Sequence, residues 1–146
     1  GLVRIHHRIT RRYTAELFDS PSGNLYGELA VDRVTYRLPS GAILHWEVEI
    51  EAKGKGNSTT VSEMMRGLLR IYGRSLRRWD YGKLATGSAV QRLIEEGSIG
   101  NLIGRDRRLL PGAYDVIDTF LRRGKCCGTN VTSHENCAVP ERGETI

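Results

Sequence analysis

Polar and charged side chains, three of them acidic, occupy every second position of the stretch HWEVEIEAK (residues 45–53), which makes it the part of the chain best suited to chemistry. Glu47, Glu49 and Glu51 alternate there with apolar residues. Successive side chains of a β-strand point to opposite faces, so the three carboxylates should share one face of a sheet with His45. Carboxylate oxygens are the ligands that Mg²⁺ and Mn²⁺ prefer. The spacing therefore predicts a surface that can hold a divalent cation.

A basic strand near the start of the chain complements this acidic one. Arg4, Arg8 and Arg12 fall on one face of a strand predicted over residues 2–17, four residues apart, and Arg11 adjoins Arg12. The forked donors of arginine match phosphate oxygens, so acids that hold an ion beside arginines could together bind a polyanion. The same pattern also fits two strands of opposite charge that simply pair across a ladder. The residue pattern leaves both interpretations open.

Three strands should position these charges. They are predicted over residues 2–17, 25–38 and 42–53, and the turn-forming sequences DSPSGN and PSG join them. Connections this short imply an antiparallel meander. His45 should lie on the acidic face as a hydrogen-bond partner rather than as a catalytic base.

Helical spacing of apolar residues replaces the alternation after the third strand. The sequence TVSE has capping-box spacing ahead of a first helix that should end at Gly73. Further helices are predicted over residues 80–97 and 111–124. The expected fold class is α+β, an antiparallel meander sheet followed by helices that cover its apolar faces. Trp46 and Trp79 are expected in the core.

Composition excludes some classes of protein. The 146 residues are 39% apolar, enough for one domain with a core, and no apolar run approaches the roughly 20 residues of a membrane span. Three cysteines do not make a disulfide framework, so a reducing, cytoplasmic setting is expected. Cys126, Cys127, His134 and Cys137 lack the spacing of a zinc site, because two of the cysteines are adjacent. Residues 125–146 lack periodicity and are expected to form a disordered tail.

Four short motifs follow one another along the chain in an order that is known from one protein family. They are ITRRYTAEL with Arg11 and Arg12, VDRV with Asp32 and Val34, HWEVEIE with Glu49 and Glu51, and WDYGKLATG with Lys83. This order resembles the second half of a CYTH domain, the triphosphate tunnel metalloenzyme family. The resemblance covers about residues 3–90.

The resemblance implies an eight-stranded antiparallel tunnel that binds a triphosphate with Mg²⁺ or Mn²⁺. It implies that Glu49 and Glu51 are the metal-binding and catalytic residues and that Asp32 supports a basic side chain. The phosphate-binding residues would be Arg8, Arg11, Arg12, Lys53 and Lys83. Glu47 has no counterpart role in the family. The implied reaction is hydrolysis of inorganic triphosphate or of a nucleoside or thiamine triphosphate, with adenylate cyclase activity less expected.

The family's first acidic strand has no counterpart before Arg4, so the tunnel would be incomplete. We expect either a fragment that lacks the N-terminal half, which the missing initiator Met favours, or two copies that complete one tunnel. Residues 1–97 would be half a CYTH-like domain and residues 98–124 a helical extension. The alternative function is non-catalytic binding of polyphosphate or an acidic ligand. No membrane partner is expected, and the acidic strand opposes nucleic acid despite the net charge of +5.

Overall fold

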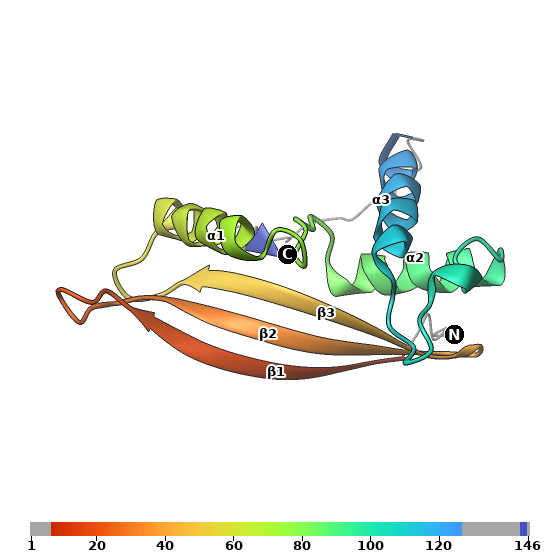
Figure 1. Cartoon of the computed structure of the whole chain (residues 1–146), viewed down its shortest axis with the longest axis horizontal. Helices are drawn as coiled ribbons and strands as arrows, with labels where there is room; N and C mark the ends of the chain where they lie inside the picture. The colour runs from red at the N-terminus through yellow and green to blue at the C-terminus, as the bar shows by residue number, and fades with distance from the viewer. Residues whose placement is uncertain (1–6, 127–143, 146) are drawn as a thin grey trace, which may run out of the picture. The chain divides into compact units, whose positions relative to one another are not determined.

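The computed structural model describes residues 7–126 and 144–145 and has an α+β architecture. Three long strands come first, β1 (His7–Phe18), β2 (Leu25–Leu38) and β3 (Gly41–Ala52). They are followed by α1 (Ser58–Tyr72), α2 (Lys83–Glu95), the 3₁₀ turn η1 (Gly100–Leu102) and α3 (Pro111–Cys126) (Figure 1). The antiparallel meander followed by helices is the predicted class. None of the described helices combines the length and the apolar character that crossing a membrane requires.

The sheet is open. Its strand order is β1-β2-β3-β4, in which the short β4 (Glu144–Thr145) runs antiparallel to β3 and pairs Thr145 with Glu49. Among the described residues β1 has a neighbour on one side only. A closed barrel with a filled interior needs about eight strands, so these residues do not contain the tunnel that the resemblance implies.

Two parts of the predicted tail have regular structure. The helix α3 continues to Cys126, and β4 is formed within residues 144–145. Parts of two predictions lie outside the described residues. They are Arg4 of the basic strand, and Cys127, His134 and Cys137 of the set that lacks the spacing of a zinc site.

The chain divides into two compact units, to which all three long strands contribute. The first comprises residues 1–10, 33–45 and 81–134 and is called the α2–α3 unit. The second comprises residues 11–32, 46–80 and 135–146 and is called the α1 unit.

In the α1 unit the helix packs against apolar strand residues. Ile50, Val61 and Met65 form the buried centre, and Leu17 and Leu29 of the neighbouring strands pack against it. This is one face of the sheet, because alternate residues of each strand point to it. The burial of these side chains is what holds α1 on the sheet.

The helix α1 begins earlier than predicted. The side chain of Asn57 accepts a hydrogen bond from the Thr60 amide at 3.0 Å, and the Thr60 hydroxyl accepts one from the Asn57 amide at 3.3 Å. The cap is therefore Asn57–Thr60 and not the predicted Thr60–Glu63. The loop before it lies against β2, because a Cβ added to Gly56 would meet the Tyr26 carbonyl oxygen at 1.7 Å.

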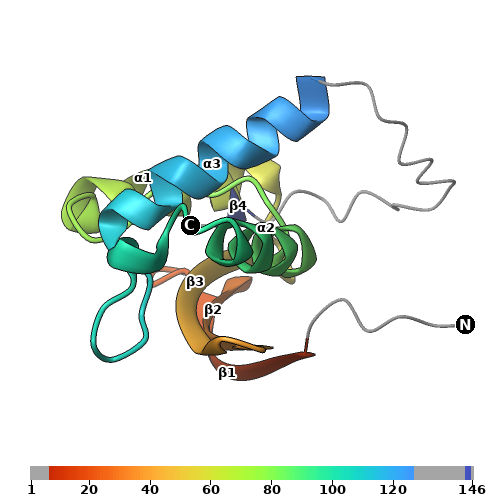
Figure 2. The ribbon, with the colours of Figure 1, turned by 90° about the vertical axis from the view of Figure 1, so that its right-hand side faces the viewer.

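In the α2–α3 unit, two tyrosines and a histidine connect the strands to the helices through hydrogen bonds. Tyr36 of β2 donates its hydroxyl proton to the Lys83 carbonyl at 2.9 Å, and His45 Nδ1 lies 2.8 Å from the Tyr114 hydroxyl. The helices α2 and α3 contact each other (Figure 2). Helix α2 starts at Lys83 rather than near the predicted Asp80.

The alternation of polar and apolar residues in the strands predicted the wrong side chains to be buried at several positions. His45 and Glu47 are 2% and 1% exposed, whereas Trp46 is 44% exposed, so its predicted core position is wrong. Trp79, at 2%, is in the core as predicted. Most apolar residues of the edge strand β1 are also exposed, among them Tyr13 at 58%, whereas Leu17 packs against the core of the α1 unit. The helices therefore do not cover all the apolar strand positions.

We expect Asn57→Ala to lower the free energy of unfolding by about 1 kcal/mol, because it removes the acceptor for the Thr60 amide. Urea denaturation followed by circular dichroism measures the change. The exposed Glu63 provides the control: Glu63→Ala should change stability by less than about 0.5 kcal/mol. A larger loss of stability from Glu63→Ala than from Asn57→Ala would favour the predicted Thr60–Glu63 cap instead.

We expect Tyr81 to make the stability of the fold sensitive to alkaline pH. Burial raises its pKa above 10.0, and the hydroxyl donates to Asp118 at 2.7 Å, which raises it further. A folded-state pKa above the unfolded value gives a contribution that is complete below pH 10 and is lost as the pH rises through the raised value. Ultraviolet titration of tyrosinate should lose its late-titrating component in Tyr81→Phe, and that variant should lose less stability above pH 10 than the parent. Identical titration curves would contradict this.

Candidate metal and phosphate site

Three carboxylates from two neighbouring strands converge in the α1 unit. Asp32 of β2 and Glu47 and Glu49 of β3 each place one carboxylate oxygen within 4.8 Å of the other two. Directly opposed residues of neighbouring strands are about 4.5–5.5 Å apart, which explains how Asp32 can approach both glutamates. We call these three residues the acidic cluster. Its oxygens are close enough together to be ligands of one cation.

Arg12 of β1 binds the acidic cluster. Its Nε donates to Asp32 Oδ1 at 2.8 Å and its Nη2 donates to Asp32 Oδ2 at 2.7 Å. The same Nη2 donates to Glu49 Oε2 at 2.5 Å. The hydrogen bonds with Asp32, followed by the charge of Glu49, raise the pKa of Arg12 further above its usual range. One permanently charged guanidinium thus connects all three long strands.

The three carboxylates of the acidic cluster differ in their exposure to solvent. Asp32 is 0% and Glu47 1% exposed, whereas the Glu49 side chain is 25% exposed. Buried carboxylates are stable only with compensating charge or hydrogen bonds, and Arg12 supplies part of that compensation. A cation that entered the cluster would reach Glu49 first, and it would add positive charge where three acids repel one another.

Glu51 and Lys53, predicted as a metal ligand and a phosphate ligand, form an ion pair with each other. Lys53 Nζ lies 3.0 Å from Glu51 Oε2, and this hydrogen bond raises the pKa of Lys53. The Glu51 side chain is 60% exposed. Glu51 follows Glu49 by two residues, yet it does not belong to the acidic cluster.

The remaining predicted phosphate ligands are divided between the units. Arg11 is exposed in the α1 unit, and Arg8 is exposed in the α2–α3 unit. Lys83 opens α2 in the α2–α3 unit. Of the predicted site residues, the structure thus brings together Arg12, Asp32 and Glu49.

Glu47 is the member of the cluster to which the family resemblance assigned no role, although it belongs to the predicted acidic face. The signal was present, because Glu47 precedes Glu49 by two residues and so shares its strand face. Asp32 was predicted to hold a basic side chain, and it accepts two hydrogen bonds from Arg12. His45, on the same strand face as Glu47, contacts Tyr114 and is not part of the cluster.

Comparison with known proteins assigns no relative to this chain. No protein-family model, characterised protein or solved structure matches it. The candidate site therefore stands on its own geometry.

We expect Arg12→Ala to reduce the free energy of unfolding by about 2 kcal/mol. It removes one partner of the buried Asp32, but the guanidinium is 45% exposed, which places the loss below the 3–5 kcal/mol of a fully buried pair. Chemical denaturation measures it. Arg11→Ala changes the neighbouring exposed arginine and should cost less than about 0.5 kcal/mol. Equal losses from the two variants would show that the contact with Asp32 contributes nothing to stability.

Proposed function

We propose that the acidic cluster binds Mg²⁺ or Mn²⁺ and that the ion, together with arginines of β1, holds the phosphates of a small triphosphate. The observation that carries the proposal is the convergence of Asp32, Glu47 and Glu49 within 4.8 Å, with Arg12 at its side. Two buried acids and one accessible acid suit an ion that keeps some positions for water and phosphate oxygens. The order of the motifs supports assignment to the CYTH family and to triphosphate as the substrate.

The proposed reaction is hydrolysis of the terminal phosphoanhydride. A bound divalent ion would neutralise charge on the transferring phosphoryl group. Glu49, the most accessible acid of the cluster, accepts a proton from the attacking water. The water oxygen forms a bond to the terminal phosphorus as the bridging P–O bond breaks in line, and the shorter phosphate leaves. Arg12, which lies on the face of the cluster, stabilises the negative charge of the phosphate oxygens, whereas Arg11 points to the opposite face of β1.

The open sheet provides one wall of such a site. A tunnel would need further strands, and in this proposal they come from an N-terminal half or from a second copy. The proposed setting is a reducing, cytoplasmic one.

A second candidate function is binding of polyphosphate or another acidic ligand without turnover. The exposed arginines Arg8 and Arg11 favour it, because they lie on the uncovered strand β1 and need no metal to attract phosphate. Binding of this kind should weaken steeply with salt and should be lost in Arg8→Ala and Arg11→Ala, whereas it should survive Glu49→Gln.

Glu49→Gln separates these two functions. Under the proposed hydrolase function, Mn²⁺ should raise the unfolding temperature of the parent chain, and Glu49→Gln should abolish that shift together with at least 90% of any triphosphate hydrolysis. At ten times the dissociation constant the ion should add about 1.4 kcal/mol to stability. Thermal denaturation with and without the ion, and release of inorganic phosphate, are the measurements.

Glu51→Gln is the matched control, because it alters the next acid of the same strand face but lies outside the cluster. It should keep both the metal response and the hydrolysis. A parent chain that shows no Mn²⁺ response would overturn the metal site. Loss of the response in Glu51→Gln but not in Glu49→Gln would place the ion at the Glu51–Lys53 pair and would overturn the acidic cluster as its site.

A further inference from the structure

The strand β1 is the uncovered edge of the sheet in the part of the chain that the structure describes. It is 12 residues long, about twice the usual length of a strand, and every residue except Leu17 is exposed. An edge strand offers backbone N–H and C=O groups to another strand, and proteins usually shorten such an edge or place charged side chains, especially lysine, or proline in it. The sequence HRITRRYTAELF contains no lysine or proline, but it carries charges of both signs, Arg8, Arg11, Arg12 and Glu16. This edge therefore suits a partner strand whose charges complement it.

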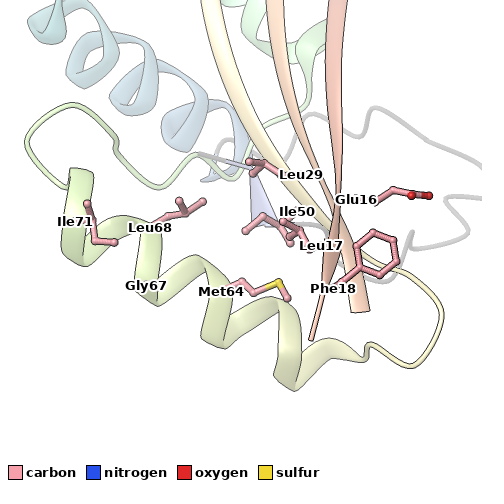
Figure 3. A pocket seen from close by; sticks show the side chains of 9 residues that line it. All are labelled: Glu16, Leu17, Phe18, Leu29, Ile50, Met64, Gly67, Leu68 and Ile71. Atoms are coloured by element: carbon pink, nitrogen blue, oxygen red, sulfur yellow. The ribbon is translucent and has the colours of Figure 1, made fainter. Parts of the chain in front are cut away.

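An apolar groove of about 440 Å³ lies where β1 meets α1, inside the α1 unit (Figure 3). Its lining residues come from the end of β1, from the neighbouring strands and from one stripe of α1, and they are Glu16, Leu17, Phe18, Leu29, Ile50, Met64, Gly67, Leu68 and Ile71. Phe18 and Ile71 are 58% and 67% exposed. The apolar face of the sheet therefore continues, uncovered, to the edge strand.

We propose that β1 pairs with β1 of a second copy, antiparallel, with Thr14 opposite the partner's Thr14. A two-fold axis perpendicular to the sheet keeps residues of equal parity on one face. Arg12 then lies opposite the partner's Glu16, so the pairing adds an acid of the partner strand beside the guanidinium that already binds Asp32 and Glu49, and the symmetry repeats this arrangement. The inference goes beyond the proposed function and does not depend on metal binding.

Charge selects this register over its neighbours. A strand centred on Arg11 or on Arg12 would place like charges directly opposite each other, which destabilises a sheet, and one centred on Tyr13 or on Ala15 would oppose no unlike charges within β1. The register centred on Thr14 instead opposes charges of unlike sign and aligns two threonines, both of which are favourable cross-strand pairs. The edge is thus self-complementary, so its charges do not protect it from its own copy. Only residues 11–17 of each copy, all within the α1 unit, are needed for it.

The same register places an aromatic side chain at the groove. Tyr13 shares the strand face of Leu17, and it is 58% exposed in the single chain. In the pair, the partner's Tyr13 lies opposite Ala15 and diagonal to Leu17, within reach of a long side chain. It covers the edge of the groove that Leu17 lines. The pairing therefore buries an apolar residue that the single chain leaves in water.

A single-cysteine crosslink tests the register. In a chain whose Cys126, Cys127 and Cys137 are replaced by serine, Thr14→Cys should form a covalent dimer on mild oxidation, because opposed residues match disulfide geometry. Arg11→Cys is the control, because the register places it opposite Leu17, about 20 Å from its own copy at about 3.4 Å per residue. Crosslinking at residue 11 as fast as at residue 14 would overturn the proposal.

Sedimentation equilibrium tests the association itself. The parent chain should be dimeric, and Glu16→Arg should raise the dissociation constant at least about tenfold, because it replaces two opposed ion pairs with like charges. Glu63→Arg makes the same charge change on an exposed residue of α1 and should leave association unchanged. A parent chain that stays monomeric over a 100-fold range of concentration up to the solubility limit would refute the pairing. A dimer whose dissociation constant is unchanged by Glu16→Arg would refute it as well. A dimer without triphosphatase activity would count against the proposed function alone.

Discussion

The contact on which the sheet depends is the bonding of Arg12 to Asp32 and Glu49. One guanidinium on β1 reaches carboxylates on β2 and β3, so it joins the three strands through their side chains as well as through their ladders. Asp32 is fully buried, and a buried carboxylate requires a compensating partner. A slip of β1 by one residue would turn Arg12 to the opposite face and leave Asp32 without it. The charge pair therefore helps to fix the register as well as the composition of the site.

The sequence predicted the strands and the class of fold because both depend on local signals. Period-two alternation and short turns defined the three strands, and a change of period marked the helices. The failures arose where a tertiary contact overrode a pattern. Trp46 is exposed although it is apolar, and His45 is buried although it is polar, because Tyr114 of a distant helix gives the imidazole a partner. A single strand carries no information about such a partner.

The candidate site shows the same limit in more detail. Residues two apart on a strand are about 6.8 Å apart along it, too far for a compact set of ligands unless their side chains converge. Glu47 and Glu49 converge near Asp32 of the next strand, whereas Glu51 is held by Lys53. Alternation could therefore identify the face that carries the acids. It could not identify which acids meet, because that choice is made by residues on other strands.

Arg12 also determines how the proposed chemistry would begin. Its hydrogen bonds to Asp32 and Glu49 give the acidic cluster a counter-charge in the chain by itself. On the proposed function, a divalent ion would bring two positive charges to the same carboxylates, which would weaken the requirement for Arg12 at Glu49, the more accessible acid. A guanidinium released from one carboxylate can then donate to phosphate oxygens, which accept the same forked geometry. On the proposed function, binding of the ion and recognition of the phosphate are therefore coupled through one side chain.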